Sequence, residues 1–524
     1  MSRHGFSKRS FLIGSAASAA AVALPEFARA APRSLTAVLE SEVVILDPHA
    51  TTAAITRTFA YHVFDTLFAM DTAGTIRPQM VDRFETAPDG LAWTFTLRDG
   101  LTWHDGVPVK ASDCVASLKR WAKGDALGKM LLAVVTAIEA RDEGSFTITL
   151  REPFPLMLDV LGKPNAPIPA MMPERIIPAG EERIKEIVGS GPFRFKADAW
   201  RAGDRMVLER FAQYRPRAEK PDFLAGGKVV NVDEVVLKTM PDDATAATAL
   251  VAGEIDYMQY LPFDWLEKLE KAQGLKVMAL TGLDMFQGNF RLNHATGPFA
   301  DKAVREILWK LVDQTEVLEA IGIPDRYVIK NCPSFFMCDA PFSSADGAAG
   351  AKLAIAEASA ALKKTAYKGE PVVFLTVAGS ISQTAGAVLA SNMRKAGFTV
   401  DEQVMDWGTV LARRAKKDGW SVFPVYANGI DMMSPLTHFY IGNNCVNYAG
   451  WSCDAVITEK LAAYAKAPDP ATRKRIAAEI QVEAYKDTPS VMWGQFSRPA
   501  GYRLRLKNIV QSSFPIFWQL TLDA

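Results

Sequence analysis

The stretch "PVVFLTVAGSISQTAGAVLASNMRKAGFTVDEQVM", from Pro371 to Met405, predicts the fold class. Residues 371–377 form a continuous apolar run, which is typical of a strand buried on both faces. Residues 398–404 predict a second strand, and the segment between them has the apolar spacing of a helix. The helical positions are Ala385, Val388, Leu389 and Met393. The stretch therefore predicts a strand–helix–strand unit.

Outside this unit, strand and helix patterns alternate along the chain. Residues 91–98 alternate apolar and polar side chains, which predicts a strand before an Asp-Gly turn. Residues 301–322 predict one long amphipathic helix. Residues 469–485 predict another, with Asp469 as N-cap and Pro470 at the first helical position. This alternation predicts α/β lobes with largely parallel sheets.

The amino-terminal segment reads as a cleaved export signal. Lys8 and Arg9 precede a run of uncharged residues, 11–24, and the small residues Ala28 to Ala30 ("ARA") follow. The run is too short to span a bilayer of roughly 30 Å as a helix. The basic pair resembles a twin-arginine signal with lysine in the first position, which leaves the Sec route open. We expect residues 1–30 to be removed and the protein to work in the periplasm.

Composition limits the class of protein. The chain has 59 basic and 59 acidic residues, and removing the signal, with four basic residues against one acidic, leaves a net charge near −3. This balance argues against nucleic-acid binding, which needs a basic face. About 490 remaining residues exceed what one hydrophobic core serves, so two or more lobes are expected. No later stretch is apolar enough for a membrane helix.

Five cysteines predict two short disulfide-closed loops. Cys332 and Cys338 lie close together in sequence, as do Cys445 and Cys453, and both pairs lie in turn-rich segments of an exported chain. Cys114 is left as a buried free thiol. Zinc binding is the alternative, but neither pair has C-x-x-C spacing and no histidine cluster accompanies them.

Several motifs, in order, resemble the family 5 extracellular solute-binding proteins of ABC transporters. This family includes dipeptide-, oligopeptide- and nickel-binding proteins. The motifs are "WHDG" (103–106), "GSGPF" (189–193), "EIDYMQYLP" (254–262), "PFADKAVREILWKLVDQTEVL" (298–318) and "NYAGWSCDAV" (447–456). We expect the first two to be structural, because Asp105 and Gly106 favour a turn and glycine beside proline favours another.

The resemblance implies a two-lobed α/β periplasmic-binding-protein fold of type II (cluster C), hinged around a ligand cleft. Lobe I would comprise residues 34–280 and 496–524, with an extra subdomain inserted at about 60–185. Lobe II would comprise residues 281–495. The strand–helix–strand unit falls within lobe II, as this division requires.

The resemblance also implies where ligand binds. Trp407 matches a tryptophan that lines the pocket of peptide binders, although a plain core tryptophan is the alternative. Phe286 and the segment "LESE" match positions that contact ligand in relatives, and Tyr426 adds a further ring. The expected ligand contacts are Leu39, Glu40, Ser41, Glu42, Phe286, Trp407, Tyr426, Asn428 and Asp431.

One expected contact departs from the family pattern. Peptide-binding relatives have an aspartate that pairs with the α-ammonium group of the peptide, and Asn428 stands at that position here. An amide supplies no charge to offset the desolvation of an ammonium group. Asp431 could replace the missing carboxylate, or Asn428 could simply be a turn residue before Gly429. A peptide ligand is therefore in doubt.

The function implied is that of a transport receptor without enzymatic activity, cofactor or bound metal. A monomer would capture a small organic solute, peptide-like or opine-like, and deliver it to an inner-membrane ABC permease. A nickel- or metal-chelate receptor is the alternative within the family, but the histidines are widely spaced. They are His49, His62, His104, His294 and His438. A secreted hydrolase is disfavoured because G-x-S-x-G and H-E-x-x-H motifs are missing from the sequence.

Overall fold

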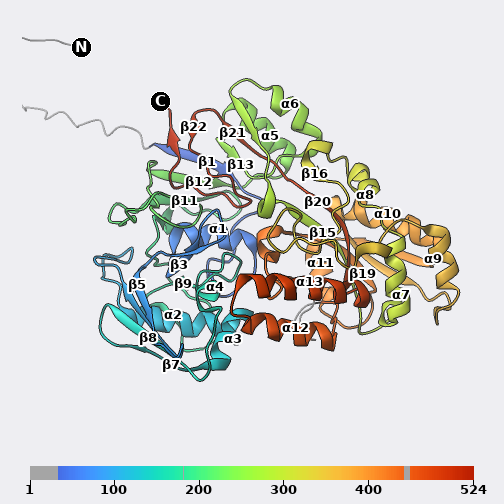
Figure 1. The fold of residues 1–524 in the computed structure, drawn as a ribbon. Coiled ribbons are helices and arrows are strands. Elements are labelled where there is room, and N and C mark those ends of the chain that lie inside the picture. The colour runs from blue at the N-terminus through green and yellow to red at the C-terminus, as the bar shows by residue number, and fades with distance from the viewer. Residues whose placement is uncertain (1–32, 181, 442–448, 524) are drawn as a thin grey trace, which may run out of the picture. The chain divides into compact units, whose positions relative to one another are not determined.

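The computed structural model describes residues 33–180, 182–441 and 449–523, and Arg33–Ala524 forms one compact unit. Two large mixed sheets divide this unit into two lobes (Figure 1). We call the part built on the seven-stranded sheet lobe I and the part built on the six-stranded sheet lobe II. No helix among the described residues is long and apolar enough to span a membrane. The predicted signal, 1–30, lies outside the described residues.

The sheet of lobe I carries its parallel strands at the centre. Strand β1 pairs in parallel with β12 and β13, so that Leu35 lies opposite Val235, and the remaining neighbours are antiparallel. In spatial order the strands are β10 (Phe193–Phe195), β11 (Arg205–Arg210), β12 (Glu234–Lys238), β1 (Ser34–Val38), β13 (Tyr257–Met258), β21 (Ala500–Arg503) and β14 (Leu275–Met278). The helices of this lobe are α1 (Ala54–Val63), α5 (Asp243–Ala252) and α6 (Leu266–Lys271).

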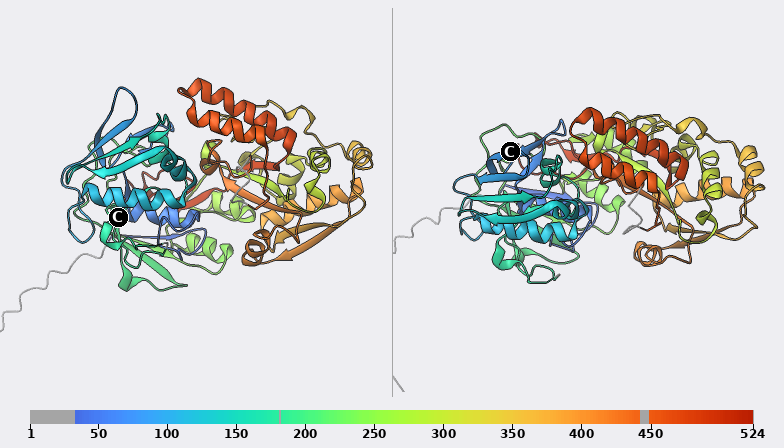
Figure 2. Two further views of the ribbon diagram at one scale, coloured as in Figure 1. Left: turned by 90° about the horizontal axis from the view of Figure 1, so that it is seen from below. Right: turned by 60° about the horizontal axis from the view of Figure 1, so that its bottom comes forward.

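The sheet of lobe II contains the strand–helix–strand unit predicted from the sequence, which is confirmed. Strands β17 and β18 pair in parallel, and α10 connects them. In spatial order the strands are β16 (Val328–Ile329), β20 (Ser490–Phe496), β15 (Phe286–Leu292), β19 (Val422–Asn428), β17 (Val372–Val377) and β18 (Val400–Met405). The helices are α7 (Lys302–Ile307), α8 (Gln314–Ile321), α9 (Ile355–Leu362), α10 (Ile381–Ala396), α11 (Trp407–Arg414), α12 (Ala455–Lys466) and α13 (Pro470–Asp487). Figure 2 shows α12 and α13 side by side.

The prediction of largely parallel sheets is wrong. In lobe II, β17 runs parallel to β18 and β19, but β15 and β20 pair antiparallel with each other and with their other neighbours. Strands that follow each other through a short connection, such as β10 and β11, pair antiparallel because only a long crossover can make them parallel. The helical crossover between β17 and β18 therefore does not predict the strand directions in the rest of the two sheets.

The single helix predicted for residues 301–322 is also wrong, because the chain forms two helices there. Helix α7 continues into a short 3₁₀ turn and ends, and α8 begins after Asp313. The carboxylate of Asp313 accepts hydrogen bonds from the backbone N–H groups of Thr315 and Glu316. This N-cap satisfies free donors at the start of α8 and so stabilises the break. Helix α13 starts as predicted, with Asp469 accepting from Thr472 N.

A smaller antiparallel sheet adjoins lobe I, in the order β5 (Val81–Thr86), β6 (Ala92–Leu97), β8 (Ser145–Leu150) and β7 (Val135–Ala140). The strand predicted from the alternation in 91–98 is thus confirmed as β6. This sheet packs against α2 (Ala111–Gly124) through a core that includes Phe95, Phe146 and Trp121. The other elements are α3 (Ala126–Val134), α4 (Met157–Leu161) and the short strands β2 (Asp65–Thr66), β9 (Ala170–Met171), β3 (Phe68–Met70), β4 (Ile76–Pro78), β22 (Leu506–Lys507) and β23 (Thr521–Leu522).

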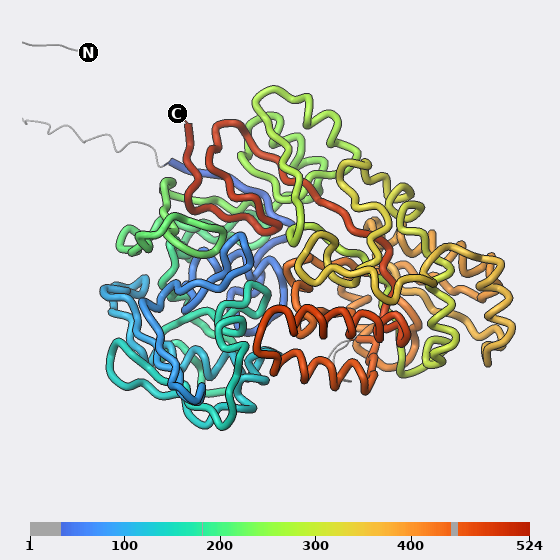
Figure 3. Tube along the Cα trace, viewed as in Figure 1, coloured from blue at the N-terminus to red at the C-terminus, as the bar shows by residue number. Residues whose placement is uncertain are grey.

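The chain passes between the lobes twice, and the two crossings lie next to each other (Figure 3). Residues 279–285 connect β14 to β15, and residues 497–499 connect β20 to β21. Strands β14 and β21 pair in lobe I, and β15 and β20 pair in lobe II. The hydroxyl of Ser497 also accepts a hydrogen bond from Leu280 N at 2.9 Å. This paired connection is the covalent link about which the lobes can turn.

Candidate functional site

A cavity of about 570 Å³ lies between the two lobes, next to the paired crossing. Its walls come from the ends of β1 and β13, from α1 and the carboxy-terminal segment of lobe I, and from β15, β19 and the start of α11 in lobe II. Seven of the nine ligand contacts expected from the sequence line it. They are Glu40, Ser41, Phe286, Trp407, Tyr426, Asn428 and Asp431.

The other two expected contacts lie outside this cavity. Leu39 packs against the core of lobe I, and Glu42 accepts a hydrogen bond from Gly203 N at 2.9 Å. Both line a neighbouring hollow on the lobe I side. Residues 40 and 41 form a bend beyond the end of β1, and only these two of the four residues line the cavity.

Aromatic rings form much of the wall of the cavity. Phe286 is almost fully buried, and its ring centroid lies 5.5 Å from that of Tyr260 and 5.6 Å from that of Tyr426, edge to face in both cases. Trp407 differs, because 45% of its surface is exposed and the guanidinium carbon of Arg414 lies 5.1 Å from the centre of its ring. Trp407 is therefore not a core residue.

A buried ion pair joins the two lobes across the cavity. The guanidinium of Arg57, on α1, donates a hydrogen bond from Nη1 to Oδ1 of Asp431, beyond the end of β19. The exposed fractions of the two side chains are 1% and 13%. The guanidinium carbon also lies 4.5 Å from the ring centre of Phe514. Arg57 was not predicted. The sequence could have indicated it, because an arginine within the apolar sequence of α1 is expected to be buried, and buried arginines are rare unless they are paired.

Neither Asn428 nor Asp431 provides the unpaired carboxylate that a ligand ammonium group would need. Asn428 caps a 3₁₀ turn, Gly429–Met432, and its Oδ1 accepts a hydrogen bond from Ile430 N at 3.2 Å. Asp431 already pairs with Arg57. A Cβ atom at Gly429 would lie 2.4 Å from Cγ of Met337, so only glycine fits this turn. The turn interpretation of Asn428 is thus correct, and its side chain also borders the cavity.

Glu40 also lines this cavity, and Arg498 lies beside two of its lining residues, Tyr260 and Tyr426, without lining it itself. Glu40 is open to the solvent in the cavity, yet protein surrounds it on most sides, and this desolvation raises its pKa. Among its neighbours, Arg498 lowers that pKa most. The guanidinium carbon of Arg498 lies 4.3 Å from the ring centre of Tyr260, and its Nη1 lies 3.4 Å from the hydroxyl of Tyr426. Arg498 and Tyr260 were not predicted either.

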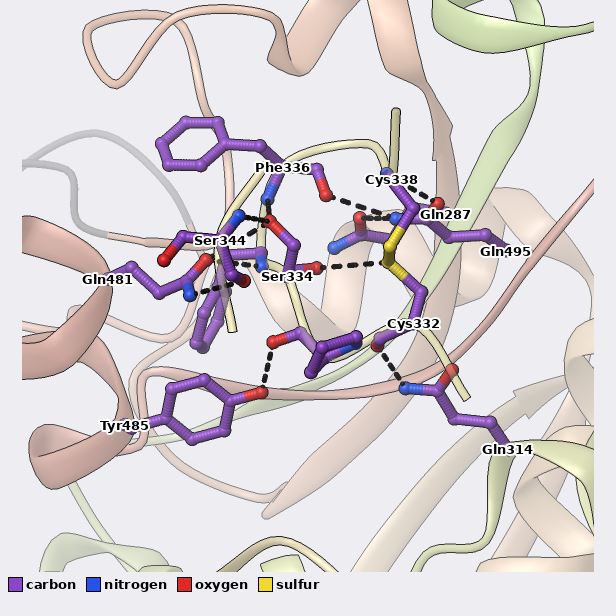
Figure 4. Close-up of a disulfide and its surroundings, with 12 residues drawn as sticks. Gln287, Gln314, Cys332, Ser334, Phe336, Cys338, Ser344, Gln481, Tyr485 and Gln495 are labelled. Carbon is purple, nitrogen blue, oxygen red and sulfur yellow. Dashed lines mark hydrogen bonds between the residues drawn. A yellow bond between two sulfur atoms is a disulfide. The ribbon is translucent and has the colours of Figure 1, made fainter. Parts of the chain in front are cut away.

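A disulfide lies in lobe II, beside Gln495 of β20 (Figure 4). Cys332 and Cys338 are bonded as predicted, with their Cα atoms 6.0 Å apart. The backbone N of Cys338 donates to Oε1 of Gln495, and Nε2 of Gln495 donates to Oε1 of Gln287, which follows Phe286 in β15. Met337, inside the disulfide loop, packs against Gly429. The loop therefore supports the segment that carries Asp431.

The remaining cysteines are only partly described. Cys445 lies outside the described residues, so its pairing with Cys453 stays a prediction. Cys114 is buried with a free thiol, as predicted, and its burial raises the pKa of that thiol.

Four of the five histidines in the described part of the chain, His49, His62, His104 and His438, are buried, and His294 is half-buried. In His104, Nε2 donates to the carbonyl oxygen of Gly191 at 3.0 Å, and Nδ1 accepts from Gly189 N at 3.3 Å. The "WHDG" and "GSGPF" motifs are therefore hydrogen-bonded to each other. Desolvation lowers the pKa of His62, His104 and His438 to about 4. Across 33–180, 182–441 and 449–523, no group of three histidine, cysteine or acidic side chains is arranged to hold a metal ion.

Comparison with known proteins agrees with this geometry. The family model described as "Bacterial extracellular solute-binding proteins, family 5 Middle" matches residues 75–448. The chain is 32% identical, over 99% of both sequences, to a "Probable peptide ABC transporter periplasmic-binding protein y4tO" from Sinorhizobium fredii. It is 27% identical to the glutathione-binding protein GsiB of Pectobacterium atrosepticum, over 57% of this chain and 55% of that protein.

Solved structures show the same fold. The PBP AgaA of A. tumefaciens R10, in complex with agropinic acid, superposes with a TM-score of 0.77 at 22% identity and covers 94% of this chain and 99% of its own. The ABC transporter-associated periplasmic binding protein DppA of Helicobacter pylori, in complex with the peptide STSA, gives a TM-score of 0.78 at 19% identity and covers 94% of this chain and 98% of its own. The two-lobed α/β fold is thus confirmed. The chain belongs to the family 5 bacterial extracellular solute-binding proteins.

Proposed function

We propose that the cavity between the lobes binds a small organic solute, which this solute-binding protein delivers to an inner-membrane ABC permease. The observation that carries the proposal is the convergence of seven expected contacts, separated by up to 391 positions in sequence, on one cavity walled by both lobes. A ligand held by both walls favours the closed arrangement, because some of its contacts form only when the lobes meet.

The lobes would move as units around the paired crossing. We place lobe I at residues 34–280 and 496–524, with the inserted subdomain at about 60–185, and lobe II at 281–495. The sheet strands support this division, since the seven-stranded sheet ends at β14 and resumes at β21, and every strand of the six-stranded sheet lies between them. A single chain supplies all walls of the cavity, which supports a monomer.

The ligand class we favour is peptide-like or opine-like. The names of the relatives support it, since one is described as a probable peptide transporter component and agropinic acid is bound by a structural neighbour. The aromatic wall suits a ligand with organic bulk. A nickel chelate is not favoured, because four of the five histidines in the described part of the chain are buried.

The site of action would be the periplasm, reached by a cleaved export signal. Lys8 and Arg9 would form the basic part of a twin-arginine-like signal, and cleavage would follow the small residues Ala28 and Ala30. The relatives named as periplasmic-binding proteins support this location.

Native mass spectrometry of protein purified from the periplasm, without refolding, tests the proposal. We expect a mass above that of the denatured chain, and the difference identifies the solute. The amino-terminal residue of the denatured chain tests the cleavage site in the same preparation. A protein that carries no extra mass, and that gains none from peptides, opines or metal chelates, contradicts the proposed function.

A further inference from the structure

A second cavity, of about 510 Å³, lies between the inserted subdomain and lobe II, and we call it the subdomain cavity. Its wall on the subdomain side includes Met70, Leu156 and Val160. Its wall on the lobe II side includes Met433 and Tyr464. None of the described residues lines both this cavity and the cavity of about 570 Å³ where we place the transported solute. The subdomain cavity is therefore a separate space, which the proposed function leaves unused.

The subdomain and lobe II touch beside this cavity. Nη2 of Arg473, on α13, donates to the carbonyl oxygen of Pro155 at 3.3 Å, and Nη1 lies 3.4 Å from Oδ2 of Asp159, on α4. Ala465 of α12 is buried in the hydrophobic core of the subdomain. Arg473 and Asp159 also line the cavity. A solute in the subdomain cavity would therefore contact two bodies that are packed against each other.

The size and the lining of the subdomain cavity suit an organic solute. Small-molecule sites have volumes of about 300–1,000 Å³ and mostly apolar walls. Besides Met70, Val160 and Tyr464, the apolar part of this wall includes Leu127 and Phe342. An apolar body in the cavity would remove this surface from water, which is favourable.

Asn165 is the polar group that indicates what this cavity binds. It lies in the loop after α4, lines the cavity and is only 7% exposed. No hydrogen bond joins its side-chain amide to any other residue in the described part of the chain. A side-chain amide has two N–H donors and an acceptor oxygen, and its burial without partners is unfavourable. A solute that both donates and accepts a hydrogen bond would satisfy this amide.

The charged side chains of the wall favour an uncharged solute. Lys163 forms a buried ion pair with Asp125, and Arg473 pairs with Asp159. The other two charged residues of the wall are exposed to solvent, and they are Asp339 and Lys474. A carboxylate or ammonium group would lose its hydration in this cavity without gaining an unpaired, buried counter-charge, which is unfavourable.

From this arrangement we infer that the subdomain cavity is a second binding site, for an uncharged solute with an apolar body and an amide group that pairs with Asn165. A primary or secondary amide supplies the N–H donor and the carbonyl acceptor that complement a side-chain amide. The apolar body would lie against Met70, Val160 and Tyr464. The inference goes beyond the proposed function, because transport of a solute from the other cavity does not require it.

Calorimetry with matched probes tests the inference. Protein stripped of bound solute is titrated with benzamide, 3-phenylpropanamide and 2-naphthamide. The amide that binds most tightly is then compared with its methyl ketone, which lacks the N–H donor, and with its carboxylate, which is charged. We expect each derivative to bind about tenfold more weakly, because each leaves a buried polar group without its partner. This comparison uses the unmodified protein, so it does not depend on the folding of any variant.

A variant of Asn165 assigns the amide contact. In Asn165→Ala the amide probe should bind about tenfold more weakly than to the unmodified protein, with an affinity close to that of its methyl ketone. Gln213→Ala is the matched control, because it removes an exposed side-chain amide that does not line the cavity. The control should leave both affinities unchanged.

Three outcomes overturn the inference. If none of the three amides binds at millimolar concentration, the cavity is not a site for this class of solute. If the ketone or the carboxylate binds as tightly as the amide, the recognised group is not an amide. If Asn165→Ala weakens the amide no more than Gln213→Ala does, or if the solute identified by native mass spectrometry displaces the amide, the probe binds elsewhere. The mass measurement tests the proposed function separately, so the proposed function can stand when this inference fails.

Discussion

Two pairs of opposite charges lie at or beside the cavity, and they differ in whether they touch. Arg57, Asp431 and Glu40 line the cavity, and Arg498 lies beside it. Arg57 and Asp431 come from different lobes and form a buried ion pair without any ligand. Glu40 and Arg498 border lobe I and the crossing, and they influence each other without pairing. A pair that closes on itself stabilises the arrangement of the lobes. A pair that stays open leaves Glu40, which lines the cavity, available to a solute.

The largest expected effect comes from breaking the closed pair. Asp431→Asn leaves the guanidinium of Arg57 buried without a counter-charge, which costs about 3–5 kcal/mol in buried pairs. Opening of the lobes would let water reach Arg57, so the cost falls mainly on the closed form. We expect ligand affinity to fall by at least about 100-fold, with a smaller change in the thermal midpoint, as measured by calorimetry and thermal unfolding.

The matched control is Asp418→Asn, which removes an exposed carboxylate in the same lobe. The double variant Arg57→Met/Asp431→Leu sharpens the comparison, because replacing both partners by apolar groups is often nearly neutral. Recovery of affinity in the double variant would show that Asp431 acts only through Arg57. Failure to recover would mean that ligand touches one of the two charges directly.

The next effect concerns the support behind the closed pair. The disulfide loop packs on Gly429, two residues before Asp431, so Cys332→Ser/Cys338→Ser should loosen the lobe II wall. The chain-entropy cost of losing this short loop is roughly 2 kcal/mol. We expect a lower unfolding midpoint and weaker binding, and the same result from gentle reduction of the unmodified protein.

Thiol labelling of unreduced, denatured protein shows how many of the five cysteines are free and how many are disulfide-bonded. One labelled thiol, Cys114, means that both predicted disulfides exist. Three labelled thiols mean that only the Cys332–Cys338 bond exists, and five would contradict both.

A third effect separates binding from packing within the aromatic wall. Trp407→Ala removes a ring that is 45% exposed, so affinity should fall about tenfold, or 1.4 kcal/mol, with little change in the unfolding midpoint. Phe286→Ala is the contrasting control, because that ring is 5% exposed and its loss should cost about 3–5 kcal/mol of stability. A large loss of stability in Trp407→Ala would contradict its role in the cavity.

Sequence patterns predicted some of this site and missed the rest for a physical reason. Phe286, Trp407 and Asp431 were located because motifs around them resemble a known family. Arg57 and Arg498 were missed because each acts through residues distant in sequence, as Arg57 and Asp431 are 374 positions apart. Periodicity predicted the strand–helix–strand unit of lobe II, whose contacts are local. The antiparallel neighbours of that unit depend on strands from elsewhere in the chain and were not predictable in this way.

The smallest effect tests the open pair through pH. Desolvation raises the pKa of Glu40 in the free protein, and a ligand ammonium group would lower it again in the complex. A carboxylate whose pKa falls on binding supports full affinity above its free-state pKa and loses it as pH falls through that value. Each unit of that fall changes affinity by about tenfold at most. We therefore expect calorimetry at a series of decreasing pH values to show progressively weaker binding of a solute with a basic nitrogen, with circular dichroism confirming that the protein stays folded. Glu40→Gln should bind more weakly at pH 7 but with little dependence on pH. An equal pH dependence in both proteins would mean that a group other than Glu40 receives the proton.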